Sequence, residues 1–308
     1  NGGCINKLTD NSCYSSINGG KTNTIIDNSC GSLISGGQTN KIIDSKWSSV
    51  NGGCCNTVSN TNVSYIGGGS SNKLTDSSYR STIVGGSNNL LTSSSRYSSI
   101  GGGFYNTLSQ SNYTSIDGGR CNTLNSSNFS TISGGYKNNI LNSTSYSSIS
   151  GGQCNTLSDT VSLSSISSGS ENVINNGSGV SIISGGSQNT IKSSSSSISG
   201  GCCNTIGENN ADSSISGGLS NTISNYSGLS SILGGDENIV SNYSPQSSIT
   251  GGYSNTISCN SGFSTITGGC SNIITNTTPT PSLSSSITGG NNILIDSSTF
   301  SWVGSGQE

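Results

Sequence analysis

The sequence contains no histidine and no methionine, and charged residues are scarce. Only 7% of its 308 residues are charged, and the acidic and basic side chains leave a formal net charge of −3. The absence of histidine removes the commonest general base and metal ligand of proteins. No basic patch favours nucleic-acid binding. No apolar run approaches the roughly 18 residues of a membrane span, so membrane insertion is not expected.

Hydrophobic residues are also few. They make up 28% of the chain, whereas ordinary globular domains have about 45–50%. Disordered chains usually combine low hydrophobicity with high net charge, and this chain has almost no net charge. The composition therefore argues against both a standard globular core and a charged random coil.

What the sequence does contain is one short motif, Ile-x-Gly-Gly-x-x-Asn-x-Ile, repeated from end to end. Its eighteen copies begin at nearly constant intervals, of which the shortest separates Gly185 from Gly200 and the longest separates Gly268 from Gly289. The first position of the glycine pair is taken by Gly2, Gly19, Gly36, Gly52, Gly68, Gly85, Gly102, Gly118, Gly134, Gly151, Ser168, Gly185, Gly200, Gly217, Gly234, Gly251, Gly268 and Gly289. Such a fixed period indicates a repeat architecture.

The motif predicts two short strands joined at a glycine corner. Alternate residues of a strand face the same side, so Ile17, Asn23 and Ile25 point inward and Thr24 points outward. One copy cannot fold alone, because its few aliphatic side chains contribute roughly 2 kcal/mol each. Ordering its backbone costs about 1–2 kcal/mol per residue. Stacked copies can hydrogen-bond to one another.

We therefore predict an all-β fold, a parallel β-solenoid with about 17 residues per coil and about 18 coils. At about 4.8 Å per coil, this makes a rod of roughly 85 Å. Residues 1–276 should form the regular repeats. Residues 277–308 should form irregular last coils, because an insertion at Thr277–Pro281 interrupts the period.

The inward asparagines need hydrogen-bond partners, since an unpaired buried amide costs about 1–3 kcal/mol. We expect each amide to donate to the carbonyl of the equivalent amide in the next coil, which forms a structural ladder. Its members include Asn6, Asn23, Asn40, Asn56, Asn221 and Asn255.

Eleven cysteines raise the question of disulfides. Cys13 and Cys30 occupy the same position in consecutive coils, so their Cα atoms should be about 5 Å apart, inside the disulfide range of roughly 4.4–6.8 Å. They are our disulfide candidates. Eight others follow the glycine pairs, where they either fill space or join rods laterally: Cys4, Cys54, Cys55, Cys121, Cys154, Cys202, Cys203 and Cys270.

No catalytic, cofactor or metal site is expected. Several aspartates, such as Asp10, Asp27 and Asp44, recur four residues after the motif asparagine, where stacked carboxylates could bind calcium. Asparagine also fills this position, which is typical of a turn. The glycine pairs lack the strand–loop–helix context of a phosphate site.

The position three residues before the inward isoleucine is often aromatic or aliphatic, as in Tyr14, Trp47 and Tyr97. Strict alternation would place it outside, as an apolar stripe suited to a lateral or trimer interface. A bend at the serine pair would instead turn it inward as a third core position. We expect the core position.

The segments Ser214–Ile223 and Ser248–Ile257, which read Ser-Ile-x-Gly-Gly-x-x-Asn-Thr-Ile, resemble the head repeats of trimeric autotransporter adhesins and related viral tail-fibre repeats. The resemblance covers nearly the whole chain. It implies a left-handed β-roll, a trimeric assembly and an adhesive role.

Three functions are considered. The first is a non-enzymatic structural or adhesive rod, an extracellular, cell-surface or virion-surface fibre or filament subunit. Its partners would be further copies of the chain, in a head-to-tail filament or a lateral or trimeric bundle, and a cell-surface or glycan receptor. The second is an ice- or other solid-surface-binding solenoid with a threonine array, although lysines such as Lys41 and Lys73 interrupt that row. The third, a polysaccharide hydrolase, needs a carboxylate pair that the scattered acids do not provide.

The chain ends suggest how a filament would form. The first copy of the motif is fully regular, whereas solenoids normally have atypical caps. We expect this end to be covered, either by more of the same chain or by the other end of another copy. Phe300 and Trp302 would then be the end-contact residues.

Overall fold

The computed structural model describes residues 3–278, 284–298 and 300–306. These residues form strands of two or three residues and no helix. Equivalent residues of paired strands are about 17 positions apart, as in Ile25 and Ile42. The fold is therefore a parallel β-solenoid, as the sequence predicts. The chain forms two compact units, Asn1–Cys154 and Asn155–Glu308.

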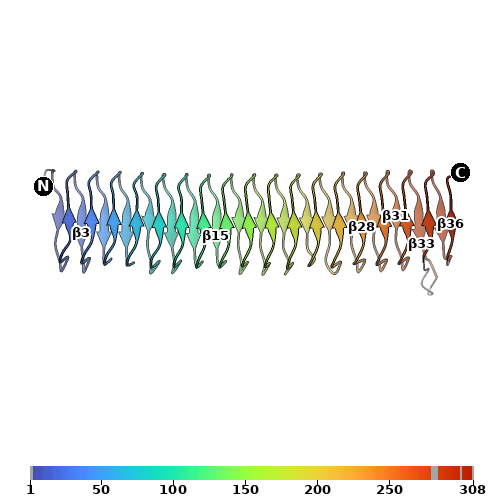
Figure 1. The fold of residues 1–308 in the computed structure, drawn as a ribbon, viewed down its shortest axis with the longest axis horizontal. Helices are drawn as coiled ribbons and strands as arrows, with labels where there is room; N and C mark the ends of the chain where they lie inside the picture. Colours follow the sequence, from blue (N-terminus) through green and yellow to red (C-terminus); the bar gives the residue numbers. More distant parts are fainter. Residues whose placement is uncertain (1–2, 279–283, 299, 307–308) are drawn as a thin grey trace. The chain divides into compact units, whose positions relative to one another are not determined.

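The first unit contains nine successive pairs of strands, one pair per coil, and Figure 1 shows its coils stacked one after another. The odd-numbered strands pair with one another in parallel, and so do the even-numbered strands. The strands are β1 (Lys7–Leu8), β2 (Ser16–Ile17), β3 (Thr24–Ile26), β4 (Leu33–Ile34), β5 (Lys41–Ile43), β6 (Ser49–Val50), β7 (Thr57–Ser59), β8 (Tyr65–Ile66), β9 (Lys73–Leu74), β10 (Thr82–Ile83), β11 (Leu90–Thr92), β12 (Ser99–Ile100), β13 (Thr107–Ser109), β14 (Ser115–Ile116), β15 (Thr123–Asn125), β16 (Thr131–Ile132), β17 (Asn139–Ile140) and β18 (Ser148–Ile149).

The second unit repeats this arrangement, with its odd-numbered strands in one parallel row and its even-numbered strands in another. Its strands are β19 (Thr156–Leu157), β20 (Ser165–Ile166), β21 (Val173–Ile174), β22 (Ile182–Ile183), β23 (Thr190–Ile191), β24 (Ser197–Ile198), β25 (Thr205–Ile206), β26 (Ser214–Ile215), β27 (Thr222–Ile223), β28 (Ser231–Ile232), β29 (Ile239–Val240), β30 (Ser248–Ile249), β31 (Thr256–Ile257), β32 (Thr265–Ile266), β33 (Ile273–Thr275), β34 (Ser286–Ile287), β35 (Leu294–Asp296) and β36 (Trp302–Val303). The predicted insertion Thr277–Pro281 falls between β33 and β34, and its last three residues lie outside the described residues.

The core of each unit is built from the motif residues. In the coil that contains β3 and β4, Asn23, Ile25 and Ile34 are fully buried. Thr24, between two of them, is half-buried and faces outward. Isoleucine, leucine or valine fills the inward position of nearly every strand, because a branched side chain packs well on the pleated surface between coils.

The expectation of an aromatic core position is wrong. Tyr14, Trp47 and Tyr97 are 94%, 66% and 42% exposed. The chain does bend here, with a φ of about +55° at Trp47 and Tyr97. The bend leaves the strand alternation intact, so the aromatic side chain lies outside and the serine that follows lies inside. An apolar stripe on the surface is the result.

Two rows of buried hydroxyls occupy the side of the coil where the aromatic core was expected. Ser32 and Ser48 belong to one row, and Ser29 and Ser45 to the other, and all four are buried. Ser32 Oγ donates to the carbonyl of Ser45 at 2.8 Å and accepts from the N–H of Ser48 at 3.1 Å. Each hydroxyl therefore connects adjacent coils, and the core is partly polar.

Candidate functional site

The motif asparagines form the most regular polar feature of both units. Asn221 is fully buried. Its Nδ2 donates to the carbonyls of Gly217 and Gly235, at 3.0 and 2.9 Å. Its Oδ1 accepts from the backbone N–H of Asn238 at 3.0 Å. The amide thus joins its own glycine corner to the next coil.

This pattern differs from the amide-to-amide ladder that the sequence analysis expects. Side-chain amides donate to glycine carbonyls, because the corner brings two of these close to Nδ2. A contact from Nδ2 to Oδ1 accompanies them in a few coils, for example Asn89 to Asn72 at 3.2 Å. The following ladder candidates all make bonds to glycine carbonyls, and all but the half-buried Asn6 are buried: Asn6, Asn23, Asn40, Asn56, Asn221 and Asn255.

Cys13 and Cys30 lie next to each other in adjacent coils. Their sulfur atoms are 2.9 Å apart and are not bonded. The hydrogen bond between them raises the pKa of the Cys13 thiol and lowers that of Cys30. The predicted disulfide would need little movement of either side chain.

The cysteines after the glycine pairs lie at the outer side of the corner. Cys4 is exposed, and Cys121, Cys154 and Cys270 are partly exposed. The two adjacent pairs, at residues 54–55 and 202–203, also have their sulfur atoms in contact.

A stack of aromatic rings runs along the outside of the first unit. Tyr97, Tyr113, Phe129 and Tyr146 stack face to face, with centroids 4.9, 5.1 and 4.8 Å apart. The Arg80 guanidinium lies 5.8 Å from the centre of the Tyr97 ring, at one end of the stack. The rings follow the coil spacing, and each of these four coils contributes one ring to the stack.

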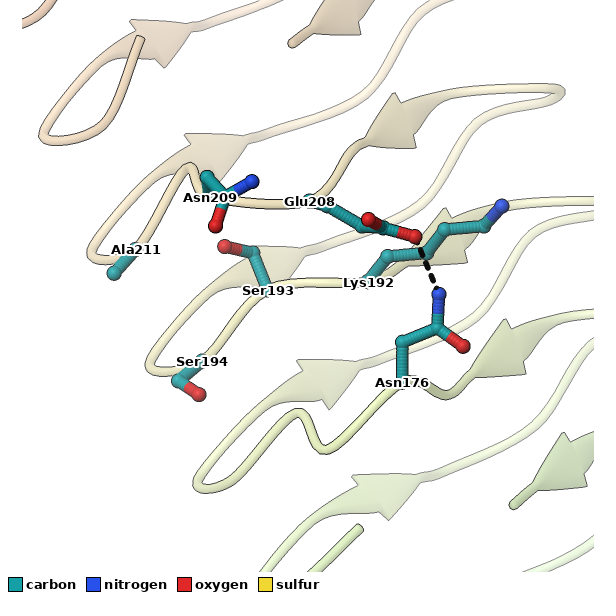
Figure 2. Close-up of a pocket in the computed structure, with 7 residues that line it drawn as sticks. All are labelled: Asn176, Lys192, Ser193, Ser194, Glu208, Asn209 and Ala211. Carbon is teal, nitrogen blue, oxygen red and sulfur yellow. Dashed lines mark hydrogen bonds between the residues drawn. The ribbon is translucent and has the colours of Figure 1, made fainter. Parts of the chain in front are cut away.

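The second unit carries a polar recess of about 450 Å³, shown in Figure 2. It lies at the shortest coil of the repeat, between the glycine pairs that begin at Gly185 and Gly200. The short coil lets the coils on either side meet, and Asn176 Nδ2 donates to Glu208 Oε1 at 2.7 Å. Lys192, from the short coil, also lines the recess.

An aromatic ring borders the neighbouring hollow of about 280 Å³, which shares Lys192 and Glu208 with the recess. This ring belongs to Tyr226, and it stacks on Tyr243 with 5.0 Å between centroids. Asn209, from the preceding coil, lines the same hollow. Carboxylate, ammonium, amide and hydroxyl groups therefore line the same hollow as an aromatic ring, an arrangement that can bind a polar ligand with apolar faces.

The two end-contact candidates are both exposed. Phe300 is 77% exposed and Trp302 is 72% exposed. Trp302 belongs to β36, which pairs with β34, and its Nε1 donates to Thr288 Oγ1 at 3.1 Å. The role of both aromatic residues in an end contact stays a prediction.

The aspartates occupy turns, as expected. Asp10, Asp27 and Asp44 have left-handed φ values of 58°, 55° and 43°, which aspartate tolerates better than most residues. Across the described part of the chain, no three histidine, cysteine, aspartate or glutamate residues form a group that could hold a metal ion. The same residues include no helix that could span a membrane.

Comparison with known proteins does not assign the chain to a family. No protein-family description matches the chain, and no curated protein is similar to it. The resemblance to adhesin head repeats therefore rests on the motif and on the solenoid fold.

Proposed function

We propose that the chain is a non-enzymatic structural or adhesive rod, a subunit of an extracellular, cell-surface or virion-surface fibre. One observation carries the proposal. Interior positions keep the same residue types and hydrogen bonds from coil to coil, whereas the surface positions vary. A scaffold needs this separation, because the interior sets the coil spacing and the surface is free to carry contacts.

Sedimentation velocity of the native protein tests this role. A rod experiences more friction than a compact particle of the same mass, so we expect a high frictional ratio. A frictional ratio typical of a compact globular particle contradicts the proposal.

We further propose that the rods associate with one another. Support comes from the exposed aromatic side chains, since large exposed apolar patches mark interaction surfaces. In a head-to-tail filament Phe300 and Trp302 would be buried at the junction. In a bundle the apolar stripe that contains Trp47 and the aromatic stack of the first unit would be buried instead.

Two tryptophan variants separate these arrangements. Trp302→Ser should reduce the sedimenting mass if the contact is head-to-tail. Trp47→Ser, which removes the other tryptophan from the lateral surface, is the matched control. A fall in sedimenting mass with Trp47→Ser alone favours the bundle. An unchanged sedimenting mass with both variants rejects both surfaces as contacts between rods.

For the adhesive role we propose a glycan receptor at the recess of the second unit. Sugars present hydroxyl groups together with apolar ring faces. The recess offers Glu208, Lys192 and amides, and the Tyr226 ring borders the neighbouring hollow, which shares both charged residues with the recess. A glycan array with the full chain tests this, with Tyr226→Ala as the binding-deficient variant and Tyr14→Ala as control. Binding that survives Tyr226→Ala places the receptor site elsewhere.

Binding to ice or another solid surface is the alternative. Its support is the in-register row Thr190, Thr205 and Thr222 on adjacent strands. The row ends at Ile239, which pairs with Thr222, and this limits the flat hydroxyl surface. A thermal-hysteresis measurement decides: activity favours the alternative, and its absence at high concentration rejects ice binding.

A further inference from the structure

Two glycine corners carry a pair of adjacent cysteines in the same sequence, Gly-Gly-Cys-Cys-Asn-Thr, at residues 52–57 and 200–205. The sulfur atoms of Cys54 and Cys55 are 2.8 Å apart, and so are those of Cys202 and Cys203. The same contact thus occurs once in each unit, at equivalent positions of the coil.

The backbone of the corner explains why the two sulfur atoms meet. Cys54 is held by parallel bridges to Gln38 and Ser70 in the neighbouring coils. The residue that follows, Cys55, has a left-handed φ of 62°, and Cys203 has the same value. Neighbouring side chains of a straight strand point to opposite faces, whereas this turn brings them to the same side.

The two thiols of each pair are accessible to solvent and hydrogen-bonded to each other. Cys55 is exposed, and the other three thiols are partly exposed. The hydrogen bond between Cys54 and Cys55 raises the pKa of Cys54, and the bond between Cys202 and Cys203 raises the pKa of Cys203. Each pair can therefore react as one dithiol.

We propose that each corner is a redox-modification site, in which the two adjacent thiols close to a vicinal disulfide by exchange with a small-molecule disulfide such as oxidised glutathione. One cysteine thiolate attacks a sulfur atom of the oxidant, breaks its S–S bond and releases one glutathione thiolate. The neighbouring thiolate then attacks the mixed disulfide, forms the Cys–Cys bond and releases the second glutathione. Two cysteine thiols are oxidised, one glutathione disulfide is reduced, and the two thiol protons pass to the released glutathione.

The closed form should be easy to reduce. The Cα atoms of adjacent residues are about 3.8 Å apart across a trans peptide, which is shorter than the usual range of about 4.4–6.8 Å for disulfides. The ring is therefore strained, and strained disulfides have more oxidising potentials. The corner can switch between a closed state and an open state with two free thiols that can bridge to another molecule. This property does not depend on the rod-like role proposed above.

The test uses the full chain, incubated with oxidised glutathione, alkylated without reduction and mapped by mass spectrometry. We expect the two corner peptides to lose two hydrogen atoms each and to resist alkylation. Closure should be slower in urea, because the corner no longer holds the thiols together. Alkylated thiols or two glutathione adducts on each corner would overturn the proposal, and so would equal rates in urea and buffer.

A variant at a third corner and one at the first cysteine corner provide matched controls. Cys270 is followed by Ser271, and its sulfur lies 3.5 Å from the serine hydroxyl. Ser271→Cys should create a third closed corner, and Cys55→Ser should leave a stable glutathione adduct on Cys54. Circular dichroism checks that each variant is folded. A folded Ser271→Cys variant that keeps two alkylated thiols contradicts the geometric argument.

Discussion

The motif asparagine satisfies three backbone groups in the core. In Asn221→Leu the carbonyls of Gly217 and Gly235 and the N–H of Asn238 lose this partner. The Gly235 carbonyl keeps the N–H of Leu219, so two groups are left unsatisfied at about 1–3 kcal/mol each, and we expect a loss of stability of about 2 kcal/mol or more. Thr222→Leu, one residue later on the outer face, should change stability by about 0.5 kcal/mol or less.

Thermal unfolding of the two variants measures this difference. Equal shifts in melting temperature would show that the inward and outward faces are assigned wrongly.

The two glycines of a corner differ in what they tolerate. Gly218 has a φ of 90°, and a Cβ there would meet the carbonyl oxygen of Gly235 in the next coil. A Cβ on Gly217 would meet nothing within 4 Å. We expect Gly218→Ala to lower the melting temperature markedly, whereas Gly217→Ala should leave it nearly unchanged.

The chain already contains one natural substitution of this kind. Ser168 occupies the first position of a glycine pair, and its carbonyl accepts from Asn172 at 3.2 Å as a glycine carbonyl would. If Gly218→Ala and Gly217→Ala lowered the melting temperature by similar amounts, the result would argue against this geometry of the glycine corner.

At the scale of elements, the aromatic stack links successive coils from the outside. Tyr113 stacks on Tyr97 and on Phe129, and each aromatic pair is worth about 0.5–1.5 kcal/mol beyond burial. Tyr113→Ala should therefore destabilise the chain by about 1–3 kcal/mol, measured by denaturant unfolding. Tyr14→Ala, at the equivalent but highly exposed position, should have little effect. An equal loss in both variants would mean that the stack contributes nothing.

A covalent link between coils is expected from Cys13 and Cys30. If the protein matures in an oxidising compartment, these neighbours should form a disulfide. Peptide mapping under non-reducing conditions checks this, with Cys13→Ser as control. The link should also resist reductant concentrations that open the vicinal pairs. Both cysteines found as free thiols in secreted protein would reject the prediction.

The strands were predictable because an isoleucine and an asparagine recur in each coil, at positions that the two-residue alternation of a β-strand places on its inner face. The serine rows were not, although Ser32 and Ser48 recur two residues before an inward branched side chain. Serine is mostly exposed in folded proteins, and its burial here depends on a bend. That bend places Trp47 and Tyr97 in a left-handed conformation that bulky residues rarely adopt, so local sequence does not reveal it.

The surface features were predictable only in part. The short interval between Gly185 and Gly200 is plain in the sequence, but the recess also depends on Asn176 and Glu208 reaching over the short coil. Adjacent cysteines are equally plain. Their sulfur contact follows from the turn at Cys55, which only the structure reveals.

At the scale of the whole molecule, the proposed role requires that one coil spacing persists along a rod. The sequence supports this, because the motif asparagines Asn138, Asn155 and Asn172 follow one another at an even interval through the middle of the chain. A continuous rod would also bring equivalent surface positions into rows long enough to serve as lateral contacts.

Electron cryomicroscopy of the native particle tests this claim most directly. We expect elongated particles, alone or joined end to end, whose averaged images contain an axial repeat of about 4.8 Å from stacked parallel coils. Compact particles without that repeat would contradict both the rod and its function.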